Sequence, residues 1–208
     1  MTIQIARFIL DPLETNTYLI TNKDSHEAII VDPAEGSRKI LEHCKEEGYV
    51  ISEIWLTHAH FDHINGIPEI ISQRNVPVRL HPKELSLYQA KGGAAMFGFS
   101  VGDLPNPRPD ILQDTRLVIG NTSIKVFHIP GHTPGHIVFY IKDEGIVICG
   151  DVIFFHGIGR TDLPGGDYES LILNINRYLL NLPPETRLLS GHGPETTVEE
   201  EKFSNLFL

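Results

Sequence analysis

The alternation of apolar and polar residues divides the chain into two similar halves. In the first half, Ile40, Leu41 and Cys44 recur at helical spacing and Gly48 follows them, which predicts a helix over Ser37–Glu47. Short apolar runs on either side of this helix are typical of strands. The first half therefore predicts strands at 3–10, 16–21, 28–32, 53–57 and 78–80, and helices at Ser37–Glu47 and about 67–74.

The second half repeats this order after residues 83–113, which follow no regular period. Tyr168–Leu180 places apolar residues on one helical face, and residues 196–200 carry the capping signals of a last helix. Strands are predicted near 115–119, 123–128, 136–142, 145–149 and 187–190. Each half thus consists of strands, then a helix, then a strand that ends in metal-competent residues, and we expect an α/β (α+β) protein.

Composition and charge narrow the class of protein. The 208 residues suffice for one well-buried domain, and we expect a single domain over 1–208. The net charge of −10, with no lysine or arginine run, argues against a nucleic-acid partner. The N-terminal segment has no basic leader and no apolar span, so we expect a cytoplasmic protein without membrane association. Cys44 and Cys149 are interpreted as reduced packing residues.

The most informative segment is Thr57–His63, Thr-His-Ala-His-Phe-Asp-His, directly after the strand-like Ile54-Trp55-Leu56. In an extended chain, residues two apart point the same way at about 6–7 Å, so His58 and His60 can bind one ion. The glycine and proline that follow predict a turn, which would direct Asp62 and His63 to a second ion nearby. The motif therefore predicts a site for two metals.

Three further candidates each follow an apolar run and are flanked by glycine or proline. His132 lies in Pro130–His136, Asp151 follows Ile146–Gly150, and His192 lies in Ser190–Gly193. Loops at strand ends are where α/β scaffolds present functional groups. Each residue alone could be an ordinary turn residue, but together with the first motif they predict a common site.

This set of motifs resembles the metallo-β-lactamase superfamily along the length of the chain. The resemblance implies a four-layer αβ/βα sandwich of two mixed sheets with outer helices. It also implies that His58, His60 and His132 hold one metal, that Asp62, His63 and His192 hold the other, and that Asp151 bridges them. We expect two divalent ions, Zn²⁺ first, with iron or manganese as alternatives. Two carboxylates and one bridging hydroxide would leave such a site near a charge of +1.

Within the superfamily, the chain resembles glyoxalase II, the hydroxyacylglutathione hydrolases, and especially their short single-domain bacterial relatives. Three stretches carry this similarity, together with the ending Asn205–Leu208: Thr57–His63, Pro130–His136 and Gly150–Asp162. The resemblance implies hydrolysis of a small-molecule thioester, an S-2-hydroxyacyl thiol such as S-lactoylglutathione, by a metal-bridging hydroxide. Asp62 and Asp151 would be the catalytic carboxylates.

The chain departs from full-length glyoxalase II in two respects. We expect no C-terminal helical glutathione-binding domain, and Pro194 and Glu195 stand where the glutathione-specific enzymes place an aromatic hydroxyl. Arg160 occupies the position where the family binds the substrate carboxylate with a cation. A guanidinium suits this role because it can donate two parallel hydrogen bonds to a carboxylate. Its alternative is a surface ion pair with Asp162 or Asp167. The thiol carrier and the oligomeric state stay open.

Two other reaction classes share the skeleton. A mononuclear iron persulfide dioxygenase would use only two histidines and the equivalent of Asp151, and its family has a similar Gly-Arg-Thr-Asp loop. A lactonase or a β-lactamase would use the same ligands, although many β-lactamases also use a thiolate that Asp62 and Asp151 do not supply. A metal-binding module without catalysis is the remaining alternative.

Other residues near the motifs have simpler interpretations. Asp32, at the end of the strand 28–32, is either a hydrogen-bond acceptor for a ligating histidine or a turn residue before Pro33. We expect the spare histidines to be hydrogen-bonding or surface residues: His81, His128, His136 and His156. The apolar residues of 91–109 either seal the edge of the core or form a wall of the acyl pocket.

Overall fold

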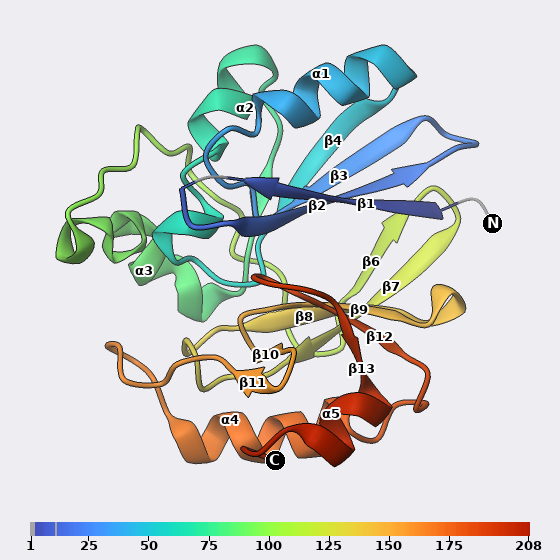
Figure 1. Ribbon diagram of the computed structural model, residues 1–208. Coiled ribbons are helices and arrows are strands. Elements are labelled where there is room, and N and C mark those ends of the chain that lie inside the picture. The colour runs from blue at the N-terminus through green and yellow to red at the C-terminus, as the bar shows by residue number, and fades with distance from the viewer. Residues whose placement is uncertain (1–2, 11) are drawn as a thin grey trace. The chain divides into compact units, whose positions relative to one another are not determined.

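The computed structural model describes residues 3–10 and 12–208, and Figure 1 follows the chain through them. The chain divides into two compact units. The first runs from the N-terminal strand to Asp110 and adds Val118–Thr122, and the second comprises Ile111–Leu117 and Ser123–Leu208. Each unit contains strands and helices of its own.

The first unit is built on a five-stranded mixed sheet in the order β1-β2-β3-β4-β5. Strands β1 to β3 are antiparallel neighbours, whereas β3, β4 and β5 are parallel and need helical connections. Helix α1 joins β3 to β4, and α2 joins β4 to β5. The strands are β1 (Ile3–Leu10), β2 (Thr15–Asn22), β3 (Glu27–Val31), β4 (Val50–Trp55) and β5 (Val78–Arg79), and the helices are α1 (Arg38–Glu47), α2 (Ile67–Gln73) and α3 (Leu85–Gln89).

Packing of α1 and α2 on this sheet forms the core of the first unit. Ile40 of α1 and Ile67 and Ile70 of α2 are buried with Ile30 of β3 and Ile54 of β4. Removing this apolar surface from water stabilises the unit by roughly 25 cal/mol for each Å² buried. The sheet and its two helices thereby fix the end of β4, from which the Thr57–His63 segment leaves.

The second sheet has six strands in the order β13-β12-β9-β8-β7-β6. Strand β12 is parallel to β9, and the pairs β7–β8, β8–β9 and β12–β13 are antiparallel. A two-stranded hairpin, β10 and β11, lies outside this sheet. The strands are β6 (Arg116–Ile119), β7 (Thr122–His128), β8 (Ile137–Ile141), β9 (Ile146–Gly150), β10 (Ile153–Phe154), β11 (Gly157–Ile158), β12 (Arg187–Ser190) and β13 (Thr196–Thr197), and the helices are α4 (Tyr168–Asn174) and α5 (Val198–Ser204).

Helices α4 and α5 complete the core of the second unit. Leu171 of α4 and Val198 of α5 are buried in one cluster with Val138, Val147 and Leu188 of the sheet. Both helices begin with a side-chain cap, because Asp167 accepts from the Ser170 N–H and Thr197 from the Glu200 N–H. The predicted helix Tyr168–Leu180 is present, but it continues after Asn174 as a wider π turn.

The fold class predicted from the sequence is confirmed: the protein is mixed α/β with two mixed sheets and helices. Most predicted elements lie within a few residues of the observed ones. The hairpin β10–β11 and the strand β13 were not predicted, because two-residue strands give no readable alternation. Across residues 3–10 and 12–208, no helix has both the length and the apolar character that crossing a membrane requires.

Candidate metal centre

The segment Thr57–His63, which we call the histidine loop, leaves the buried end of β4 and closes in a 3₁₀ turn over Phe61–His63. The ring centroids of His58 and His60 are 4.9 Å apart, and those of His58 and His63 are 4.2 Å apart. His58 and His63 are completely buried. The loop thus brings His58 and His60 together, as the spacing of the motif predicted, and places the His63 ring beside His58 as well.

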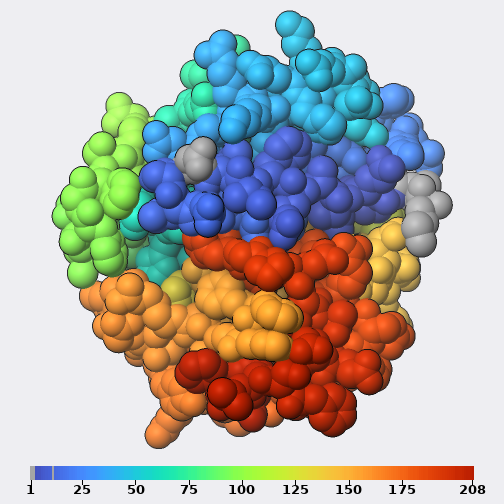
Figure 2. Space-filling view, in the orientation of Figure 1, coloured from blue at the N-terminus to red at the C-terminus, as the bar shows by residue number. Residues whose placement is uncertain are grey.

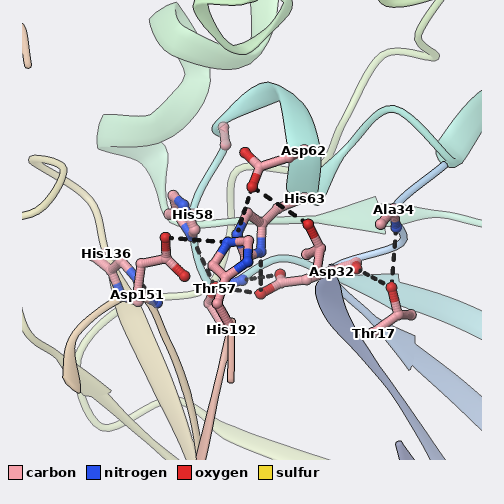
Figure 3. Close-up of polar contacts among 12 residues, drawn as sticks. Thr17, Asp32, Ala34, Thr57, His58, Asp62, His63, His136, Asp151 and His192 are labelled. Atoms are coloured by element: carbon pink, nitrogen blue, oxygen red, sulfur yellow. Dashed lines mark hydrogen bonds and ion pairs between the residues drawn. The ribbon is translucent and has the colours of Figure 1, made fainter. Parts of the chain in front are cut away.

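Asp32, at the end of β3, holds two of these imidazoles in a defined tautomer. Its Oδ2 atom accepts from His63 Nδ1 at 3.2 Å and from the Thr57 hydroxyl at 2.5 Å, and its Oδ1 atom accepts from the Thr57 N–H at 2.7 Å (Figure 3). Since the Thr57 hydroxyl donates its proton to Asp32, the contact of 3.0 Å between His58 Nδ1 and Thr57 Oγ1 must have His58 as donor. Both rings therefore carry their proton on Nδ1, which leaves Nε2 as the basic atom, the form that a metal ligand requires.

The backbone at Asp32 adopts a left-handed conformation, which places its carboxylate beside Thr57 and His63. Its φ angle is +53°, a region that non-glycine residues seldom adopt outside turns and functional sites. The Thr17 hydroxyl donates to the Asp32 carbonyl at 2.7 Å and accepts from the Ala34 N–H at 3.1 Å, which stabilises this turn (Figure 3). Asp32, His58 and His63 also bring potential ligand atoms within 4.8 Å of one another. Because both Asp32 oxygens already accept hydrogen bonds, we assign it to orienting the rings.

Asp62 lies at the edge of the same cluster. Its Oδ2 atom is 3.5 Å from His63 Nε2 and accepts a long contact of 3.4 Å from the Thr15 hydroxyl. The side chain is 13% exposed, whereas His63 is fully buried. The turn therefore brings Asp62 and His63 to the same place, as predicted. Thr15 and Thr17 were not identified from the sequence, since isolated threonines in a strand carry no functional signal.

In the second unit, His132 lies in the loop between β7 and β8 and is oriented by a backbone group. Its Nδ1 atom donates to the carbonyl oxygen of Arg160 at 2.8 Å, so Nε2 is again the basic atom. The approach requires Gly159, because a Cβ there would lie 1.8 Å from the Asp151 carbonyl oxygen and 3.2 Å from His132 Cβ. Gly159 therefore allows the backbone next to Arg160 to pass close to Asp151 and His132.

Asp151 and His192 meet because they follow two parallel neighbouring strands, β9 and β12. The Gly191 N–H donates to the Gly150 carbonyl at 2.8 Å and fixes the two strand ends together. A single oxygen of Asp151, Oδ2, lies 3.7 Å from His132 Nε2 and 3.7 Å from His192 Nε2. The close-up shows this carboxylate beside the His192 ring (Figure 3). The aspartate thus stands between two histidines.

These distances fit a metal better than hydrogen bonds. A separation of 3.7 Å is beyond the usual N–H···O range of about 2.7–3.2 Å. Two ligand atoms that are each about 2.1 Å from one ion are roughly 3 to 4 Å apart at ordinary coordination angles. The donor set of neutral imidazoles and carboxylates is that of zinc, iron or manganese.

The spare histidines make hydrogen bonds, as expected. His136 is fully buried and its Nε2 atom accepts the N–H of Asp151 at 3.1 Å, so it holds the backbone of that aspartate. The other contacts are His81 Nδ1 with the Lys83 N–H, His128 Nε2 with the Pro134 carbonyl and His156 Nε2 with Glu200.

The side chain of Arg160 forms a two-pronged ion pair with Asp162. Nε and Nη2 donate to the two carboxylate oxygens at 2.8 and 2.7 Å, and both side chains are more than half exposed. The hydrogen bonds from Arg160 lower the pKa of Asp162 to about 2 and raise the pKa of the guanidinium. The structure therefore contains the surface ion pair that was the alternative interpretation, with Asp162 as the partner. A role in binding substrate stays a prediction.

Comparison with known proteins places these two clusters in a family. The model of the metallo-β-lactamase superfamily matches residues 10–192. The chain is 40% identical over 206 residues to the probable metallo-hydrolase YqgX of Bacillus subtilis, covering 97% of this chain and 96% of the relative. It is 34% identical over 188 residues to the hydroxyacylglutathione hydrolase GloC of Haemophilus influenzae, covering 89% of each.

Solved structures agree with this assignment. The BLEG-1 B3 metallo-β-lactamase superposes with a TM-score of 0.89 at 36% identity, over 99% of both chains. The protein TTHA1623 in a di-iron-bound form superposes with a TM-score of 0.89 at 37% identity, over 98% of this chain and 100% of the other. That residues 1–208 form a single domain stays a prediction. The match over residues 10–192 and these relatives show that the chain belongs to the metallo-β-lactamase superfamily of metallo-hydrolases.

Proposed function

We propose that the protein is a dinuclear metallohydrolase that cleaves S-2-hydroxyacyl thioesters such as S-lactoylglutathione. The observation that carries the hydrolase assignment is the position of Asp151 Oδ2, which lies 3.7 Å from the basic nitrogens of both His132 and His192. One carboxylate oxygen between two histidines is the arrangement expected for a bridge between two ions. The relative GloC, described as a hydroxyacylglutathione hydrolase, supports the thioester substrate.

In this proposal seven side chains hold two ions. One ion is bound by His58, His60 and His132, and the other by Asp62, His63 and His192, with Asp151 shared. Two divalent ions and two carboxylates leave a positive site, which favours an anionic nucleophile and a developing oxyanion. When bound, the ions supply a nucleophile derived from water and polarise the thioester carbonyl.

The protein side chains keep this site ready for binding. Asp32, Thr57 and the carbonyl of Arg160 fix the proton of His58, His63 and His132 on Nδ1, so the three rings present Nε2 without a change of tautomer. His136 holds the N–H of Asp151 and limits the movement of its carboxylate. Such orientation lowers the reorganisation needed when substrate and metal arrive.

The substrate class follows from two features. A thiolate is a good leaving group, so thioester hydrolysis does not require a proton donor from the protein. The guanidinium of Arg160 is exposed and forms a fork that suits a carboxylate, and Asp162 occupies that fork in the structure. We propose that a substrate carboxylate replaces Asp162 at Arg160, while zinc, with iron or manganese as alternatives, occupies the ligand set.

The test combines a count of the bound metal ions with an assay of thioester hydrolysis. Protein purified without chelators is expected to contain two metals per chain by mass spectrometry and to release thiol from S-lactoylglutathione. One iron per chain, with oxygen uptake on a persulfide, would instead assign the protein to the dioxygenases. Hydrolysis of a lactone or of a chromogenic β-lactam without thioester cleavage would likewise overturn the substrate assignment.

A further inference from the structure

The residues that alternate with the proposed ligands in the histidine loop have anchors of their own. Ala59 separates His58 from His60, and Phe61 separates His60 from Asp62. Ala59 is completely buried and Phe61 is 6% exposed. The groups that contact them come from one later stretch of the chain, Glu84–Phe99, which lies in the part where the sequence pattern is irregular.

The first contact is polar. Glu84 ends the short turn Pro82–Glu84, and its carboxylate accepts the N–H of Ala59 at 2.9 Å. Glu84 is fully buried, although a carboxylate in the interior is costly unless it is well hydrogen-bonded. Because the bonded amide belongs to the residue between two histidines, this contact fixes the peptide that sets their mutual orientation.

The second contact is a close approach of two backbones. Gly92 has a φ angle of +65°, and a Cβ at this position would lie 2.2 Å from Phe61 N and 2.7 Å from the Ala59 carbonyl oxygen. Only glycine allows the chain to pass so close. Gly93, by contrast, has no neighbour closer than the Met96 sulfur at 3.8 Å. Of the two glycines, Gly92 is therefore the one that packs closely against the histidine loop.

The third contact is aromatic. The ring of Phe61 stacks on Phe99 with centroids 4.9 Å apart and on Phe97 at 5.7 Å. Phe97 and Phe99 are 43% and 38% exposed, and the green segment that contains them lies at the surface in Figure 2. The aromatics of 91–109 thus cover a residue of the histidine loop. Whether their exposed faces also contact an acyl group stays a prediction.

We propose that four residues of this stretch act together as a positioning clamp for the histidine loop, with Glu84 as the polar anchor: Glu84, Gly92, Phe97 and Phe99. The clamp acts on Ala59 and Phe61 and so holds His58, His60 and Asp62 at the spacing that metal binding needs, before a metal arrives. Partners that hydrogen-bond metal ligands directly typically change metal affinity by 10–100-fold when lost, and Glu84, which acts through Ala59, is expected at the lower end of this range. This inference rests on the proposed binding of metal by His58 and His60.

The experiment is a titration of metal-free protein with Co²⁺, followed by visible absorption, which reports both affinity and ligand geometry. Glu84→Leu, which removes the acceptor, is expected to weaken Co²⁺ binding at least tenfold and to change the spectrum. Glu84→Gln keeps an acceptor oxygen and is expected to remain within about threefold of the parent. The double variant Phe97→Ala/Phe99→Ala should weaken binding at least threefold.

The matched control is Tyr88→Phe. Tyr88 lies in the same stretch and is buried, but its hydroxyl donates to the Pro105 carbonyl, away from the histidine loop. It should lower the melting temperature without altering Co²⁺ affinity or spectrum, which separates general destabilisation from the clamp. If Glu84→Leu does not fold, the double phenylalanine variant decides the matter.

The titration distinguishes failure of the proposed metal centre from failure of the proposed clamp. If the parent protein binds no Co²⁺, the proposed metal centre is wrong. If the parent binds Co²⁺ and a folded Glu84→Leu or the double variant binds it with the same affinity and spectrum, the clamp is wrong and the metal centre stands.

Discussion

The Nδ1 atom of His132 donates to the carbonyl oxygen of Arg160 at 2.8 Å, so Arg160 contributes to the site through its backbone as well as its side chain. The guanidinium points to Asp162, whereas the carbonyl fixes a proposed metal ligand. These two contributions can be separated by mutation, since a side-chain substitution leaves the carbonyl in place.

Arg160→Ala is therefore expected to raise the KM for a carboxylated thioester about tenfold while metal content stays near that of the parent. The reason is that the substrate carboxylate loses its partner but His132 keeps its acceptor. Steady-state kinetics and metal analysis on the same preparation check both parts. An unchanged KM would return Arg160 to the role of a surface ion pair.

Arg187→Ala is the matched control for Arg160→Ala, because Arg187 forms a similar exposed two-pronged pair with Glu195. It should leave KM unchanged. The pH dependence adds a further check. The pKa of Asp162 is lowered to about 2, so the pair is complete above about pH 4 and is lost only as the pH falls through about 2. Between pH 5 and 8 the pair should cause no inflection in KM.

Asp151→Ala is expected to lose most of both metals, because the same oxygen is proposed to serve both ions. A variant that loses only one ion would show that Asp151 is a ligand but not a bridge. Asp143→Ala, an exposed aspartate in the turn before β9, should retain two metals per chain. Metal counting by mass spectrometry distinguishes the loss of both ions, the loss of one ion and the retention of two.

Asp32→Asn tests the orientation of the histidine rings. An amide cannot accept from the Thr57 N–H, the Thr57 hydroxyl and His63 together as the carboxylate does, so metal affinity should fall about 10–100-fold. Thr57→Val removes the hydroxyl that contacts His58 and donates to Asp32, but it leaves Asp32 its contacts with the Thr57 N–H and His63, so its effect should be smaller. Competition with a coloured chelator measures both. Equal effects of the two substitutions would argue against separate support of His58 and His63.

The sequence pattern predicted most of the strands and the candidate ligands because both are encoded locally, whereas the two mixed sheets were expected from the resemblance to the superfamily. Residues such as His58 and Asp151 follow apolar runs directly, so a strand pattern and a short motif locate them. The contact between His58 and His60 also follows from spacing alone. For these features, tertiary structure adds the distances but not the identity of the residues.

Among the supporting residues, Asp32 was predicted as a possible acceptor for a histidine. The others could not be predicted, because their partners are distant in the chain. Glu84 is 25 residues from Ala59 and lies in a stretch without regular pattern. The role of Thr17 depends on the left-handed backbone of Asp32, which no sequence period indicates. Arg160 shows a different limit, since the sequence left both a substrate-binding cation and an ion pair with Asp162 or Asp167 open, and the structure contains the ion pair with Asp162.

The two cysteines should be unreactive in the native protein. Burial raises the pKa of Cys44 to about 11 and raises the pKa of Cys149 further, so little thiolate is present at pH 8. A thiol reagent at pH 8 should label neither residue until denaturant is added, when both react. The stability that comes from protonated Cys44 is complete below about pH 9 and is lost as the pH rises towards 11. Rapid labelling of the folded protein would contradict this prediction.

The last prediction concerns the buried polar residues that join α5 to the hairpin β10–β11. Asn205 donates to the Gly157 carbonyl at 3.1 Å and to Glu201 at 2.7 Å, and Glu201 also accepts from the His156 N–H and the Thr196 hydroxyl. In Figure 2 the orange hairpin and the dark red C-terminal residues meet at the surface. This connection supports the segment between Asp151 and Arg160.

Asn205→Asp should be more harmful than Asn205→Ala. The alanine loses the hydrogen bonds and should lower the free energy of unfolding by about 1–3 kcal/mol. The aspartate also places a second carboxylate beside buried Glu201, so the free energy of unfolding should fall further at neutral pH. Part of this stability should return at lower pH, where one carboxyl of the pair is protonated. Leu206→Ala, at a side chain that is 96% exposed, should stay within about 0.5 kcal/mol of the parent. Denaturant titrations at pH 5 and pH 8 measure these differences, and an aspartate variant as stable as the alanine variant at pH 8 would contradict the role assigned to Glu201.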